Sequence, residues 1–238
     1  MEITPEITTL SVLLIGFLLG LQHAVEADHL AAVSAIVSEK KNIFSASIIG
    51  GLWGVGHTIS LFIVGILVIF LKLQISESVE AKLEAIVGGM LVLLGINALR
   101  KLFTAREIHA HSHEHDGVRP HTHIHLHKDE LSETGEKSHH RLSPRSVLIG
   151  MIHGLAGSAA LMLLVLPTIA SPFIALLYIL IFGVGSIAGM MLMSFLIGLP
   201  FHFTANNFVQ LNKAIRLCAG IFSLGLGMFI IYEKLLQS

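Results

Sequence analysis

Long blocks of apolar residues are the dominant feature of this sequence. Six stretches are each long and apolar enough to cross the hydrocarbon core of a bilayer, which takes about 20 helical residues. Six such blocks in 238 residues leave too little polar surface to cover a water-soluble core, and only 13% of the residues are charged. The sequence therefore predicts an all-α integral membrane protein with transmembrane helices at residues 8–37, 46–73, 81–103, 145–170, 172–201 and 211–235.

Positive charge is distributed unevenly between the two ends of these predicted helices. The N-terminus, the second and fourth connections and the C-terminus hold three Lys and Arg residues, whereas the other connections hold twelve. Because Lys and Arg concentrate on the cytoplasmic side, we expect a multi-pass protein of the plasma (inner) membrane with both termini outside. No basic face indicates a nucleic-acid partner, and a single cysteine, Cys218, excludes a disulfide framework.

The chain is divided by a polar, His-rich segment that we expect to be a disordered cytoplasmic loop, residues 104–144. Glycine motifs recur in the same order on either side of this loop, at offsets of 129 to 132 residues. Residues 1–103 and 145–238 therefore each form a predicted three-helix repeat. Because three is an odd number of spans, the repeats must be inverted relative to each other. The matched segments are 19–23 with 149–153, 53–57 with 182–186, and Gly88 and Gly95 with Gly220 and Gly227.

Four ionisable residues, His23, Glu26, Asp28 and His29, lie within seven positions of the first predicted helix. A carboxylate at bilayer depth costs about 2.5–3.5 kcal/mol unless it is compensated. A bound divalent cation would compensate both carboxylates, so the segment predicts a transition-metal site. The alternative is that these groups pair with one another, face a polar crevice or lie at the membrane surface.

Helical geometry places three of these residues on one side of the helix. In a regular helix His23, Glu26 and His29 fall within an arc of about 120°, whereas Asp28 points away. Either the helix is distorted here, or Asp28 orients a neighbouring imidazole without binding the metal. We favour distortion, because a broken helix also frees backbone groups as ligands.

The second predicted helix adds His57, preceded by small residues that let another backbone approach closely. The alternative reading is a buried histidine that hydrogen-bonds a carbonyl group. In the second repeat Ser186 stands at the position of His57, and His153 is the one member of the ionisable set that is retained. We therefore expect the first repeat to bind the metal, with the second contributing at most His153 and Ser158.

The central loop is rich in alternating histidines. Such a pattern in an extended chain can chelate metal through several weak, exchangeable arrangements, so we expect unselective binding for capture, sensing or storage. These predicted loop ligands are His109, His111, His113, His115, His121, His123, His125, His127, His139 and His140.

Three segments resemble the motifs of the nickel/cobalt transporter family, in its six-helix branch of urease-accessory-type nickel permeases. They are residues 23–29 (HAVEADH), 54–58 (GVGHT) and 153–160 (HGLAGSAA). The resemblance covers both halves but not the central loop. It implies Ni²⁺ or Co²⁺ as transported substrate, with His23, Asp28, His29 and His57 as selectivity residues. Glu26 departs from the family pattern, where Asp is commoner, which leaves the metal preference open.

Ligand chemistry agrees with that resemblance, since imidazole and carboxylate suit Ni, Co, Zn and Fe(II). Met190, Met191 and Met193 splay around their helix and are expected to serve packing.

The expected function is transport by alternating access through a His/Asp/Glu site near the membrane midplane, without a prosthetic group. The sequence leaves open whether the protein works in uptake or efflux. It also leaves open whether the protein forms a homo-oligomer or has a cytoplasmic metal-delivery partner. The alternatives from other classes are an intramembrane di-iron metalloenzyme and a metal-sensing receptor.

Overall fold

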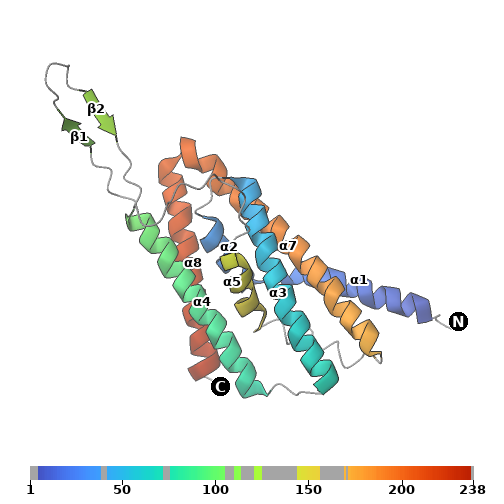
Figure 1. The fold of residues 1–238 in the computed structure, drawn as a ribbon. Helices are drawn as coiled ribbons and strands as arrows, with labels where there is room; N and C mark the ends of the chain where they lie inside the picture. Colours follow the sequence, from blue (N-terminus) through green and yellow to red (C-terminus); the bar gives the residue numbers. More distant parts are fainter. Residues whose placement is uncertain are drawn as a thin grey trace.

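Helices make up almost all of the regular structure in the computed structural model (Figure 1). The structure describes residues 5–38, 42–71, 76–104, 110–113, 121–124, 144–155, 169 and 171–236. The predicted all-α fold is confirmed for the described residues other than two short strands at 110–113 and 121–124. The helices described are α1 (Pro5–His23), α2 (Ala27–Val37), α3 (Ile43–Leu71), α4 (Glu77–Thr104), α5 (Pro144–Gly154), α7 (Pro172–Asn207) and α8 (Val209–Leu236).

Three of the described helices, α3, α7 and α8, are long and apolar enough to cross a membrane. Helices α1 and α2 together make a fourth candidate span, bent by 54° at a short break. Helix α4 has 28 residues, but Glu77, Glu80 and Glu84 make its first turns polar. Helix α5 ends at Gly154, and most of the rest of its predicted span lies outside the described residues. A multi-pass membrane protein is thus supported, with up to four of the six predicted spans recognised within the described ranges.

The break between α1 and α2 falls within the ionisable segment. The amide of Glu26 donates to the carbonyl oxygen of His23 at 3.1 Å, a bond one residue shorter than in an α-helix. Glu26 itself is extended, with φ −64° and ψ 152°, and the regular ladder resumes when the amide of Leu30 donates to its carbonyl oxygen at 3.0 Å. The predicted distortion of the first helix is therefore confirmed.

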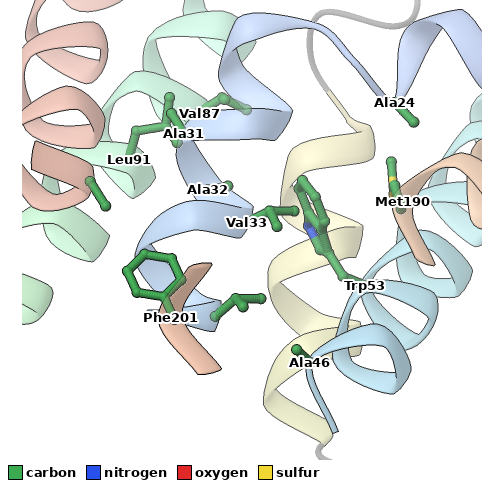
Figure 2. Packing of buried hydrophobic residues seen from close by; sticks show 12 residues of the cluster. Ala24, Ala31, Ala32, Val33, Ala46, Trp53, Val87, Leu91, Met190 and Phe201 are labelled. Carbon is green, nitrogen blue, oxygen red and sulfur yellow. The ribbon is translucent and has the colours of Figure 1, made fainter. Parts of the chain in front are cut away.

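The short helix α2 lies inside the bundle, in contact with α4, α7 and α8. Around it the other helices pair as α4 with α8, α3 with α7, α1 with α7, and α3 with α5. Figure 2 shows Val33 of α2 pointing toward Trp53 of α3, while Ala31 faces Val87 and Leu91 of α4. The apolar face of α2 therefore anchors the segment that carries the ionisable residues.

Glycines let several of these helices meet backbone to backbone. A Cβ atom on Gly20 of α1 would collide with the carbonyl oxygen of Phe182 in α7. A Cβ on Gly56 of α3 would likewise collide with the carbonyl oxygen of Val147 in α5. Small residues at such contacts are the usual means of close helix packing in membranes. The backbone on either side of His57 is consequently held close to α5.

Two short strands, β1 (Ala110–His113) and β2 (His121–Ile124), pair in antiparallel fashion within the segment for which the sequence predicts disorder. The alternation of histidine with other residues has the two-residue period of a strand, and this explains why these residues pair although the sequence predicts disorder. The register pairs His111 with His123 and His113 with His121.

Candidate metal centre

Four histidines from four helices converge beside the break between α1 and α2. They are His23 at the end of α1, His29 in α2, His57 in α3 and His153 in α5, each no more than 2% exposed. The Nε2 atoms of His23 and His57 are 3.2 Å apart, and His153 Nε2 is 3.3 Å from His29 Nδ1. Residues that are up to 130 positions apart in the sequence therefore form one buried cluster.

Asp28 contacts two of these imidazoles at once. Its Oδ1 atom is 3.0 Å from His29 Nδ1, and its Oδ2 atom is 3.1 Å from His153 Nε2. Oδ1 also accepts the backbone amide of His29 at 2.9 Å. The kink before α2 thus turns the carboxylate, predicted to point away in a regular helix, toward the cluster.

The cluster contains two overlapping groups of three metal-ligating side chains. One is His23, His29 and His57, and the other is Asp28, His29 and His153; in each, the candidate ligand atoms lie within 4.8 Å of one another. Ligands about 2.1 Å from a cation stand about 3–4 Å apart, so only small shifts are needed to surround an ion. His29 belongs to both groups, which we call the His57 triad and the His153 triad.

Several ring nitrogens of the cluster lack a hydrogen bond in the described part of the chain. These buried atoms are the Nδ1 atoms of His23, His57 and His153 and the Nε2 atom of His29. An unsatisfied buried polar atom costs about 1–3 kcal/mol. Because His29 Nδ1 faces Asp28 and His153, its Nε2 is the nitrogen available to the His57 triad. A cation bound to these nitrogens would offset part of the free-energy cost of leaving them without a partner.

Glu26 stands apart from the other predicted ligands. Its side chain is 39% exposed, and its Oε1 atom lies 2.9 Å from His23 Nδ1 without the angle of a hydrogen bond. It belongs to neither triad. In this arrangement Glu26 faces the outer nitrogen of His23, so it is placed to orient that ring and to compensate charge on it.

Two aromatic rings enclose the cluster, and sequence reasoning did not identify them. Trp53 lies 5.2 Å from His29 and 5.2 Å from His153, and Phe182 lies 5.6 Å from His23, measured between ring centroids. Both are 1% exposed. The available signal was their matching position, since each begins a Gly-x-Gly motif in its own half of the chain. Their buried rings pack against the imidazoles of the cluster.

Several other predicted ligands lie outside the described residues, so their positions stay predictions. They are Ser158 in the second half and, in the central loop, His109, His115, His125, His127, His139 and His140.

Comparison with known proteins shows that a family model described as NicO, high-affinity nickel-transport protein, matches residues 9–230. A relative from Bacillus sp. (strain TB-90), the urease accessory protein UreH, is 38% identical over 243 residues, which cover 96% of this chain and 93% of the relative. A putative nickel/cobalt efflux system from Methanocaldococcus jannaschii is 32% identical over 95 residues, or 39% of this chain and 44% of that protein. The chloroplast protein FOR GROWTH AND FERTILITY 2 of Arabidopsis thaliana is 25% identical over 92% of this chain, which spans 55% of its length. No solved structure matches the chain.

Proposed function

The chain belongs to the NicO family of high-affinity nickel-transport proteins, and we propose that it carries Ni²⁺ or Co²⁺ across the membrane by alternating access through the histidine cluster. The observation that supports this most is the convergence of four buried imidazoles and the Asp28 carboxylate at a break in a membrane helix. Nitrogen and carboxylate ligands suit these ions, and a buried site requires that the ion lose most of its water. Family membership makes the chain a transporter and not an enzyme.

We propose further that residues 1–103 and 145–238 are inverted repeats, because contacts between the halves come in reciprocal pairs. A Cβ on Gly20 would meet the carbonyl oxygen of Phe182, and a Cβ on Gly150 would meet that of Trp53. Gly150 follows Gly20 by 130 residues and Phe182 follows Trp53 by 129. Helix α1 therefore meets α7 as α5 meets α3, which is the relation expected of copies related by a two-fold axis.

A second reciprocal pair supports the same symmetry at the far ends of the repeats. A Cβ on Gly88 of α4 would lie 2.9 Å from the carbonyl oxygen of Gly227 in α8. Exchanging each residue for its counterpart 132 positions away gives Gly220 and Gly95, and a Cβ on Gly220 would lie 3.5 Å from the carbonyl oxygen of Gly95. Helices α4 and α8 thus pack through equivalent surfaces.

The shared ligand His29 suggests how the ion moves through the cluster. A neutral imidazole offers one lone pair, because its other nitrogen carries the proton. His29 can therefore serve the His57 triad through Nε2 or the His153 triad through Nδ1, but not both at once. His23 and His153 are counterparts in the two repeats and stand on either side of His29. Rocking of the repeats would pass a single ion from one triad to the other.

We propose that the His-rich segment binds metal transiently on the cytoplasmic side, which is the side that the excess of Lys and Arg predicts for it. The pairing of His111 with His123 and of His113 with His121 brings candidate ligands from two strands to adjacent positions. Binding of this kind would concentrate ions near the transport path without selecting among them.

Metal content and tolerance of cells with and without the protein test the proposed function. We expect expression to change the cell content of nickel or cobalt more than that of zinc or iron. Raised content with lower tolerance would assign uptake, whereas lowered content with higher tolerance would assign efflux. Unchanged content and tolerance for all four metals, with the protein present in the membrane, would contradict the proposal.

A further inference from the structure

A cavity of about 330 Å³ lies between α2, α4 and α8, outside the histidine cluster but in contact with it. Its lining includes Glu26, Ala27 and Asp28, the residues of the helix break. Asp28 is shared, because its carboxylate oxygens also contact His29 and His153. The cavity therefore leads directly to one ligand of the His153 triad. Its remaining lining residues are Glu84, Val87, Leu226, Ile230 and Lys234.

An ion pair joins two walls of this cavity. Lys234 Nζ of α8 lies 2.6 Å from Glu84 Oε2 of α4, with side chains that are 36% and 16% exposed. Partly exposed ion pairs contribute little to stability, whereas ionisable residues in membrane helices usually mark a substrate or ion path. In the cavity lining the pair is accompanied by apolar residues of both helices, Val87, Leu226 and Ile230.

The position of the pair defines the side from which the cavity is approached. Glu84 lies near the start of α4 and Lys234 near the end of α8, and Figure 1 shows these two helix ends at the same end of the bundle. The strands β1 and β2 lie beyond the opposite end of α4 (Figure 1). On the orientation that the Lys and Arg counts predict, the cavity faces the extracytoplasmic side.

Resting on the proposed transport function, we propose that this cavity is the access path for the metal ion and that Glu84 captures the ion, with Lys234 as its counter-ion at rest. At the same separation a divalent cation attracts a carboxylate about twice as strongly as an ammonium group does. An arriving ion takes the place of Lys234 at Glu84, and Glu26 and Asp28 then draw it toward the histidines. The opening of the ion pair therefore accompanies occupation of the path.

Opposite effects of removing the two charges test this proposal. The measurement is the initial rate of labelled nickel flux into vesicles that contain the full chain, applied from the cavity side. Glu84→Gln should raise the half-saturating nickel concentration about tenfold, because the capturing charge is lost. Lys234→Gln should lower it about threefold or more, because Glu84 is then unpaired. Glu77→Gln, which removes an exposed carboxylate from α4 outside the cavity lining, should leave it unchanged.

Shifts in the same direction for both variants would mean that the ion pair is only structural, and no shift in either would remove Glu84 from the path. Either result with wild-type flux intact would overturn this inference and leave the proposed function standing. Absence of nickel flux in wild-type vesicles would overturn both.

A second measurement keeps Glu84 and Lys234 unchanged, so it does not depend on whether their variants fold correctly. In a Cys218→Ser background, Ala27→Cys places a thiol on the cavity wall at the helix break. A water-soluble methanethiosulfonate reagent added on the cavity side should modify this thiol, and nickel should slow the modification about tenfold or more. A thiol that is unreactive, or that reacts at the same rate with and without nickel, would show that the cavity is not the path.

Discussion

Replacement of His29 by alanine is expected to abolish both metal binding and metal transport, whereas replacement of His153 should lower transport strongly and leave most of the binding. His29 is the one residue common to both triads, so its loss leaves neither position with three ligands. The loss of a direct ligand should weaken nickel binding by more than the about 10–100-fold typical of supporting residues. His153→Ala leaves the His57 triad complete, so binding should stay within about tenfold of wild type while flux falls by about tenfold or more.

These variants are compared in detergent for equilibrium nickel binding and in vesicles for flux. The ten histidines of residues 104–144 are replaced by glutamine throughout, so that binding by the central segment does not contribute. His202→Ala, which removes an exposed histidine of α7 outside both triads, is the matched control. Flux like that of wild type in His29→Ala would refute the role of the cluster. Equal loss of binding in His29→Ala and His153→Ala would refute the transfer of the ion between two triads.

The second large effect concerns packing. Gly95→Leu should strongly destabilise the protein, because a Cβ at this position lies 2.7 Å from the backbone nitrogen of Leu224 and 2.8 Å from the carbonyl oxygen of Gly220. Backbone atoms cannot rotate away as a side chain can, so α4 and α8 must separate. Overpacking of this kind costs about 1–3 kcal/mol, and the larger leucine side chain places the expected effect at the upper end of that range.

Gly89→Leu provides a control on the same helix, since a Cβ at Gly89 meets nothing within 4 Å. Thermal stability is measured as the temperature at which the detergent-solubilised protein loses its monodisperse chromatographic peak. We expect a clear drop for Gly95→Leu and little change for Gly89→Leu. Equal stability of the two variants would contradict the backbone contact between α4 and α8.

Much of the fold was predictable because it depends on local sequence. Blocks of apolar residues determine where helices form in a membrane, whatever their neighbours are. The break after His23 could also be predicted from the sequence, because Asp28 could bind the same ion as His23 and His29 only if the helix was distorted. The structure bears this out through the extended conformation of Glu26.

The way in which the helices come together was harder to predict. Glycine motifs indicated close contacts, but they did not say that α1 would pack on α7 and α3 on α5. This packing places His153 beside Asp28. The second half therefore contributes more to the cluster than its lack of other ionisable residues suggested. The same packing leaves Glu26 beside the outer nitrogen of His23 and outside both triads.

Glu84 and Lys234 illustrate a different limit of sequence reasoning. Each is an ordinary charged residue near the end of its own helix, and separations of 150 positions carry no sign of pairing. Their shared role on the cavity wall emerges only when α4 and α8 are placed side by side. A carboxylate inside a predicted membrane block, as Glu84 is, was the available clue.

The most direct test is the nickel X-ray absorption spectrum of the purified full-length protein with its ten central histidines replaced by glutamine. A nickel ion held by either triad must show the multiple scattering of at least two imidazole rings, together with fewer water ligands than the hydrated ion. A spectrum with oxygen ligands alone and no imidazole scattering, from protein that still transports nickel, would contradict binding of the ion by the buried histidines.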